Sequence, residues 1–166
     1  RWVAATVRPE RRFHALNAAE LTGDTALSQL FGHVKGAFTG ATADRAGAFE
    51  AAHGGVLFLD EIGDVPGPIQ AALLRAIDPG MIRPVGGTQE KPVDVFVVAA
   101  SSVLEERVAS GAFRRDLFER LTQATVDIPP LRDRREDIGA LVRHLLPTGQ
   151  GADLEPDVVE ALMLHT

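Results

Sequence analysis

The chain lacks cysteine altogether, and only 5% of its 166 residues are aromatic. Without cysteine it can form neither disulfides nor thiolate metal sites. Its five histidines are scattered without the spacing of zinc ligands, which argues against a histidine metal centre. No apolar run approaches the roughly 18 residues of a membrane-spanning helix, and no signal peptide is visible. These absences favour a soluble intracellular domain.

A basic stripe is also missing, because the formal net charge is −6. An acidic chain of this kind binds nucleic acid poorly by itself. The apolar content of 45% is enough to bury a core without disulfides or metals. Because the first residue is Arg1 rather than methionine, we expect the chain to be part of a longer protein.

Apolar runs of strand length predict a parallel sheet. The strongest is Val56 to Leu59, which follows two glycines, and Val93 to Ala100 has the same character. Continuous rather than alternating apolarity is typical of strands that are buried on both faces. Phe13 to Leu16 and Ala124 to Ile128 are weaker candidates.

Helical patterns lie between and beyond these runs, which predicts an α/β layered fold. Pro68 suits a first helical turn, and apolar residues then recur at helical spacing as far as Ile77. Shorter helices are expected at 103–108 and 116–121, and an amphipathic one at 138–145. A further helix is expected to begin at Pro156.

An acidic pair, Asp60-Glu61, directly follows the strongest strand. Ligands of open α/β sheets bind at the carboxyl ends of strands. A carboxylate there can hold a magnesium ion that bridges nucleotide phosphates, and its neighbour can orient an attacking water. The pair could equally end a strand and face water.

A hexad of small residues surrounds one aromatic: Gly36, Ala37, Phe38, Thr39, Gly40 and Ala41. A loop of this composition would expose Phe38, and an exposed aromatic on a loop indicates a partner contact. The alternative is a glycine-rich turn with Phe38 folded back into the core.

Arginines are concentrated in residues 113–121, where Arg114 and Arg120 stand six positions apart. If Arg114 precedes the first helical turn, the two could converge on one phosphate. The alternative is a charged helix that faces solvent.

Together and in this order, these features resemble the central AAA+ domain of bacterial sigma-54-dependent transcription activators, also called bacterial enhancer-binding proteins. The resemblance runs from about Phe13 to Leu146. Its most specific part is residues 30–35 followed by the hexad. Residues 54–62 look like the Walker B strand of that family, and 129–138 match its lead into the helical lid.

The resemblance implies a three-layer P-loop NTPase-like (AAA+) fold, in which helices flank a parallel sheet and a C-terminal helical lid begins. Residues 1–130 would form a partial α/β subdomain and 131–166 the start of the lid. The implied activity couples ATP hydrolysis to remodelling of the sigma-54 RNA polymerase closed complex. The implied machine is a cytoplasmic bacterial ring, expected to be a hexamer, that contacts DNA only through another domain.

The resemblance also implies roles for single residues. Asp60 would bind magnesium through the nucleotide, and Glu61 would polarise the water that attacks the γ-phosphate. Asn17 would pair with that glutamate and sense the nucleotide state. Arg114 and Arg120 would be arginine fingers that reach the nucleotide of a neighbouring subunit, so a lone subunit should be nearly inactive.

The hexad would contact sigma-54, with Phe38 and Thr39 at its tip. A second surface loop, formed by Ile62 to Gln70, would move with it.

The chain also departs from the family pattern. No Gly-x-x-x-x-Gly-Lys loop (Walker A) occurs in it, so we expect this piece alone not to bind ATP usefully. Ser102 stands where the family has the sensor I asparagine, which puts that nucleotide contact in doubt. Gln29 replaces a glutamate, and Ala18 a cysteine. The sensor II arginine would lie beyond Thr166.

Three functions therefore stay open. The first is an active ATPase of which this chain is the middle part. The second is a relative that binds sigma-54 without hydrolysing ATP, which Ser102 and the lack of a phosphate loop favour. The third is an unrelated magnesium-dependent hydrolase that uses Asp60-Glu61, for which Asp64 and Asp94 are the nearby candidate ligands.

Overall fold

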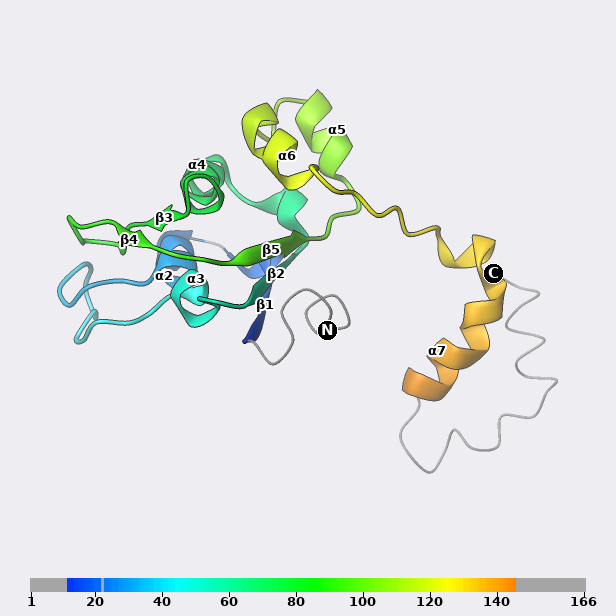
Figure 1. Cartoon of the computed structure of the whole chain (residues 1–166), viewed down its shortest axis with the longest axis horizontal. Helices are drawn as coiled ribbons and strands as arrows, with labels where there is room; N and C mark the ends of the chain where they lie inside the picture. The colour runs from blue at the N-terminus through cyan, green and yellow to red at the C-terminus, as the bar shows by residue number, and fades with distance from the viewer. Residues whose placement is uncertain (1–11, 22, 146–166) are drawn as a thin grey trace. The chain divides into compact units, whose positions relative to one another are not determined.

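A computed structural model describes residues 12–21 and 23–145 (Figure 1). The chain divides into two compact units, Arg1–Ala124 and Thr125–Thr166. The first unit carries the sheet, the helices that pack on it and every residue with a predicted catalytic or binding role. No helix in the described part of the chain is long and apolar enough to cross a membrane.

The centre of the first unit is a parallel sheet of three strands. They are β1 (Phe13–Asn17), β2 (Val56–Asp60) and β5 (Phe96–Ala99), in the order β1-β2-β5. The predicted parallel sheet is therefore confirmed. Because all three strands run the same way, their carboxyl ends lie at one edge, where Asn17 pairs in register with Asp60.

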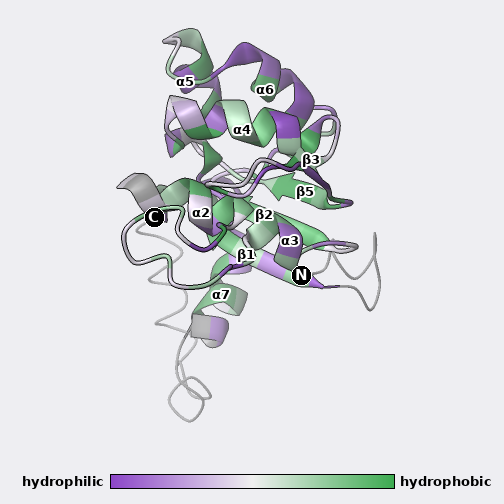
Figure 2. Ribbon diagram, turned by 90° about the vertical axis from the view of Figure 1, so that its left-hand side faces the viewer, coloured by the Kyte–Doolittle hydropathy of each residue, from purple (hydrophilic) through white to green (hydrophobic). Residues whose placement is uncertain are grey.

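One face of the sheet forms the core with α2 (Ala26–Phe31), α3 (Ala48–Ala51) and α4 (Gly67–Ile77). Leu57 and Leu59 point into this core and are fully buried. Each such leucine stabilises the fold by about 1.5–3 kcal/mol. Figure 2 shows β2 and β5 as largely hydrophobic, whereas hydrophilic colour is concentrated on α5 and α6.

The opposite face of the sheet carries aromatic side chains. Phe13 on β1 stacks on Phe58 of β2, with ring centroids 6.5 Å apart. Phe13 is 37% exposed and Phe96 is 39% exposed.

The predicted helices are confirmed, with small shifts at their ends. α4 has a proline in its first turn, as expected from Pro68. α5 covers Leu104–Ala109, α6 covers Arg115–Leu121, and α7 of the second unit covers Ile138–Leu145. The helix expected from Pro156 lies outside the described residues.

Several short elements complete the description. Three 3-10 turns accompany the sheet: η1 (Ala18–Glu20), η2 (Gly23–Thr25) and η3 (Ile62–Asp64). An antiparallel hairpin joins β3 (Met81–Ile82) to β4 (Lys91–Pro92). The second unit begins with η4 (Leu131–Asp133) and η5 (Arg135–Asp137).

Two expectations are wrong. Residues 124–128 form no strand, and Val126 is 85% exposed. A strand requires a neighbouring backbone for its hydrogen bonds, and no strand among the described residues pairs with this segment. Residues 62–70 are not a surface loop, because they form η3 and the first turn of α4, with Ile62 and Ile69 in the core.

Candidate functional site

The carboxyl edge of the sheet brings together the polar residues that follow its strands. Asp60 ends β2 beside Asn17 of β1. On the other side, the backbone of Ala100 donates to Leu59 O at 2.9 Å and accepts from Ile62 N at 3.0 Å. These bonds hold the segment after β5 against the end of β2. Asp60-Glu61, Asn17 and the serines after β5 therefore share one edge.

Glu61 has an unusual backbone conformation, with φ 52° and ψ 44°. In the described chain it is the only residue other than glycine with a positive φ. Left-handed backbone is costly for such a residue and is concentrated at functional sites. The turn begins where the Asp60 carboxylate accepts a hydrogen bond from Glu61 N at 3.2 Å. It ends β2 abruptly and places two carboxylates side by side.

No cationic side chain among residues 12–21 and 23–145 pairs with Asp60 or Glu61. Two adjacent carboxylates at one edge attract a cation. The described residues include no cluster of three or more metal-ligating side chains. A magnesium ion that arrives with a nucleotide needs only one or two carboxylates, because water and phosphate oxygens complete its shell. The donors present therefore fit a magnesium ion carried by a nucleotide.

Asn17 lies at this edge, but its oxygen is already used. Its Oδ1 accepts a hydrogen bond from Ala19 N at 3.0 Å and so caps η1. The described structure contains no hydrogen bond between Asn17 and Glu61. Its position beside Asp60 nevertheless keeps the amide within the same group of polar side chains.

The two serines after β5 differ in their surroundings. Ser101 Oγ accepts from Val103 N at 3.3 Å and lies against Gly63, where an added Cβ would stand 2.7 Å from that oxygen. Ser102 is exposed, and its hydroxyl has no partner in the described residues. Of the two, Ser102 is free to contact a ligand, although it offers only one hydroxyl.

The two candidate arginine fingers pair with different aspartates. Arg114 precedes α6, and its guanidinium donates to both carboxylate oxygens of Asp116, from Nε at 3.0 Å and from Nη2 at 2.7 Å. These hydrogen bonds, which Arg114 donates and Asp116 accepts, lower the pKa of Asp116 and raise the pKa of Arg114. Arg120 lies in the last turn of α6 and pairs with Asp78 at the end of α4. Both guanidinium groups are about half exposed.

The hexad folds into a compact double turn. Gly36 N donates to Ala41 O at 2.8 Å, and Ala41 N donates to Phe38 O at 3.0 Å. Gly36 and Gly40 have positive φ values of 82° and 98°, which glycine adopts without strain. The tip is open, because an added Cβ on either glycine would meet nothing within 4 Å.

Phe38 is held at the surface rather than in the core. It is 39% exposed, and its ring makes an edge contact with His33 at a centroid distance of 5.0 Å. His33 Nδ1 is in turn 2.7 Å from the hydroxyl of Ser28, a buried residue of α2. Phe38 is therefore exposed to solvent, and the His33 ring supports one side of it.

Residues 33–46, which contain the hexad, project from the first unit. The two ends of this projection lie close together and form a narrow neck. Its ends are paired by two 2.9 Å hydrogen bonds between the backbones of His33 and Arg45. Two glycines make this approach possible. A Cβ on Gly32 would lie 2.4 Å from Arg45 O, and one on Gly47 would lie 2.3 Å from Gly32 N.

The segment that accompanies the hexad is the β3–β4 hairpin, which sequence reasoning missed. Val34 N donates to Val85 O at 3.1 Å, and Val85 N donates to Gly32 O at 2.9 Å. A Cβ on Gly86 would stand 2.7 Å from the Cβ of Ala37. Figure 1 shows both projections on the same side of the first unit. Gly86-Gly87 was the available signal, because paired glycines commonly mark a hairpin turn.

Known proteins with similar sequences are transcription regulators. The profile of the sigma-54 interaction domain matches residues 3–127. DNA-binding transcriptional regulator NtrC from Escherichia coli K12 is 52% identical over 159 residues, or 95% of this chain and 33% of NtrC. A Nif-specific regulatory protein from Herbaspirillum seropedicae is 49% identical over 140 residues, covering 84% of the chain and 26% of that protein. The chain thus spans between about a quarter and a third of the length of these curated relatives.

Solved structures of NtrX from Brucella abortus have the same fold. The complex with ADP matches 96% of this chain and 36% of NtrX, with a TM-score of 0.81 and 34% identity. The complex with ATP matches 82% and 29%, with a TM-score of 0.72 and 38% identity. The profile match covers most of the chain. The chain belongs to the sigma-54 interaction domain family of bacterial transcription activators.

Proposed function

We propose that this chain is the central part of an ATPase that remodels sigma-54 RNA polymerase. The observation that carries the proposal is the pair Asp60-Glu61, held by a left-handed turn at the carboxyl edge of a parallel sheet without a cationic partner in the described chain. Nucleotides bind at this edge in α/β folds. The NtrX structures, which contain ADP or ATP in a similar fold, support the same assignment.

Each polar residue of the edge has a role in this proposal. Asp60 holds magnesium, which when bound offsets the charge of the nucleotide phosphates. Glu61 orients the attacking water and accepts its proton. We assign to Asn17 and Ser102, which follow the neighbouring strands at this edge, the sensing of the terminal phosphate, Ser102 with a single hydroxyl. The residues that cradle the other phosphates are not among those described.

The arginines supply positive charge to the nucleotide of a neighbouring subunit. In the isolated chain Arg114 and Arg120 rest on aspartates at half-exposed positions, where ion pairs are weak and exchange easily. A ring, which we expect to be a hexamer, would bring the two arginines of each subunit to the phosphates bound by the next subunit. Within such a ring, the hexad with Phe38 and Thr39 at its tip contacts sigma-54.

The first test measures ATP turnover by the complete natural protein that contains this chain. If each site is shared between subunits, the rate per subunit should rise steeply with protein concentration as the ring assembles, and removal of magnesium by EDTA should abolish it. A rate per subunit independent of concentration would contradict the shared site. No turnover at any concentration, with sigma-54 binding retained, would instead favour the alternative of a non-hydrolysing regulatory relative.

A second test concerns the hexad. The variant Phe38→Ala should lose capture of sigma-54, because the phenyl side chain is the apolar group that the loop exposes. Its free energy of unfolding should stay close to that of the wild type. A pull-down with purified sigma-54 measures capture, and thermal unfolding measures stability. Phe96→Ala is the matched control, because Phe96 has the same 39% exposure on the sheet face. Normal capture by folded Phe38→Ala would contradict the proposed contact.

A further inference from the structure

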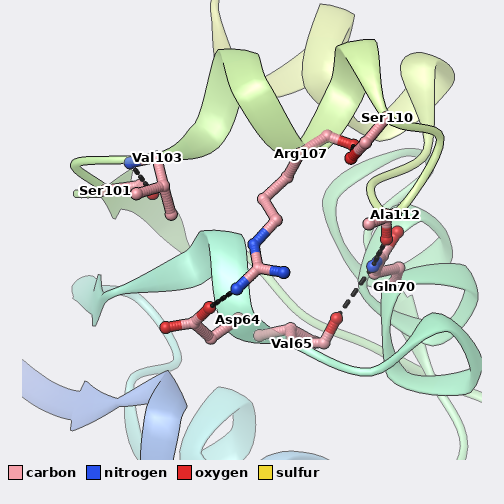
Figure 3. Close-up of polar contacts among 8 residues, drawn as sticks. All are labelled: Asp64, Val65, Gln70, Ser101, Val103, Arg107, Ser110 and Ala112. Atoms are coloured by element: carbon pink, nitrogen blue, oxygen red, sulfur yellow. Dashed lines mark hydrogen bonds and ion pairs between the residues drawn. The ribbon is translucent and has the colours of Figure 1, made fainter.

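Gln70 is a buried amide that joins two distant parts of the first unit. It lies in the first turn of α4 and is only 1% exposed. Its Nε2 donates to Val65 O at 2.8 Å and to Ala112 O at 2.9 Å, and its Oε1 accepts from Arg114 N at 2.8 Å. Figure 3 shows the side chain between Val65 and Ala112. A buried amide that makes three hydrogen bonds is tightly fixed in position and orientation.

The bonds to Ala112 and Arg114 enclose a single residue, Phe113. Its side chain is 2% exposed, so it anchors this turn in the core. The Gln70 amide pairs with the carbonyl before Phe113 and the N–H after it, much as a neighbouring strand would. These two hydrogen bonds fix the backbone of Arg114, the residue that directly precedes α6.

The other contacts that join α5 and α6 to η3 and α4 are less directional than the hydrogen bonds of Gln70. Leu73 of α4 and Leu117 of α6 are both fully buried, but apolar packing does not fix a unique rotation. The ion pair of Arg107 with Asp64 links α5 to η3 at 2.8 Å, yet both side chains are about half exposed (Figure 3). The Gln70 amide is the one side chain in the described residues that hydrogen-bonds to the backbone of Arg114.

We propose that Gln70 is a positioning residue for the Arg114 finger. It links the turn that follows the Asp60-Glu61 pair, through Val65, to the backbone that carries the guanidinium. The proposal rests on the proposed function, because Arg114 needs positioning only if it serves a neighbouring nucleotide. Gln70 itself touches no nucleotide. It determines where Arg114 leaves the subunit surface.

The variant Gln70→Met keeps the length of the side chain and removes all three hydrogen bonds. A displacement of about 1 Å at a reacting group can cost roughly 100-fold in rate. In the complete protein we therefore expect kcat for ATP to fall by roughly 10- to 100-fold, with KM little changed. Gln123→Met, the same substitution at an exposed position just beyond α6, should keep the wild-type kcat.

Mixed rings separate positioning from general damage. Gln70→Met subunits keep their own Asp60-Glu61 pair but offer a misplaced finger, whereas Glu61→Ala subunits offer an intact finger with an inactive site. A mixture should therefore hydrolyse ATP faster than either variant alone. Arg114→Ala mixed with Glu61→Ala is the positive control. In that mixture, too, an intact Asp60-Glu61 pair of one subunit meets an intact Arg114 of its neighbour.

The inference is overturned if folded Gln70→Met has the wild-type kcat. It is also overturned if its lower kcat is not restored by mixing while that of Arg114→Ala is. If thermal unfolding shows that Gln70→Met does not fold, Gln70→Asn, which keeps the amide on a shorter side chain, is taken through the same mixtures. An inactive wild type would show a different failure, that of the proposed function, and the positioning role would fall with it.

Discussion

Arg114→Ala is expected to lower kcat for ATP hydrolysis by about 10³- to 10⁵-fold, the contribution of an arginine finger to phosphoryl transfer. The effect should be large because guanidinium charge matters most in the transition state, where charge on the transferring phosphoryl group spreads over its oxygens. Ring assembly should persist, because the guanidinium of Arg114 has only one partner in the described structure, the exposed Asp116. Turnover measured beside sedimentation of the assembled protein checks both points.

The matched control is the next residue along the chain. Arg115 is exposed and makes only a 3.6 Å surface pair with Glu119, one turn away on α6. Arg115→Ala should therefore retain the wild-type rate. Equal losses in the two variants would indicate that α6 itself is disturbed. Wild-type turnover by Arg114→Ala would remove Arg114 from the site and leave Arg120 as the remaining candidate.

Glu61→Ala is expected to lower turnover by about 10²- to 10⁴-fold, the usual contribution of a general base. The alanine keeps the left-handed turn and removes the carboxylate that orients the water. Nucleotide binding should persist, because Asp60 remains available for magnesium. Turnover together with binding of a fluorescent ATP analogue distinguishes a loss in catalysis from a loss in affinity.

A glutamate outside the site provides the comparison. Glu105 is exposed in the first turn of α5 and makes no hydrogen bond or ion pair with its side chain in the described residues. Glu105→Ala should keep the wild-type rate. If Glu61→Ala keeps it as well, the hydrolytic site lies elsewhere. If Glu61→Ala lowers the unfolding temperature and both kinetic constants together, the residue serves the β2 turn rather than the chemistry.

The layered fold could be predicted because its signals are local. The apolar run at 56–59 is long enough for one buried strand, and the periodicity after Pro68 matches α4. The acidic pair could be placed at the sheet edge by the same reasoning, since the end of a parallel strand fixes where the next residues lie. These features depend on neighbours in sequence and need no knowledge of distant contacts.

Features that depend on distant partners were missed or misassigned. Residues 124–128 have the composition of a strand, but pairing decides whether one forms. The polar residue Gln70 closes a segment expected to be a surface loop, yet its three backbone partners bury it. Asn17 ends its strand beside Asp60, whereas the partner of its side chain is set by the local turn at Ala19.

The close approach of Gly32 and Gly47 makes residues 33–46 a segment that can be changed independently of the core. Its two ends lie side by side, held by the paired backbones of His33 and Arg45, so the length of chain between them does not alter the spacing that the core must accommodate. Substitutions at the tip can therefore be made without redesign of the interior. A spectroscopic label at Thr39 would report on the loop while the hydrophobic packing beneath it stays untouched.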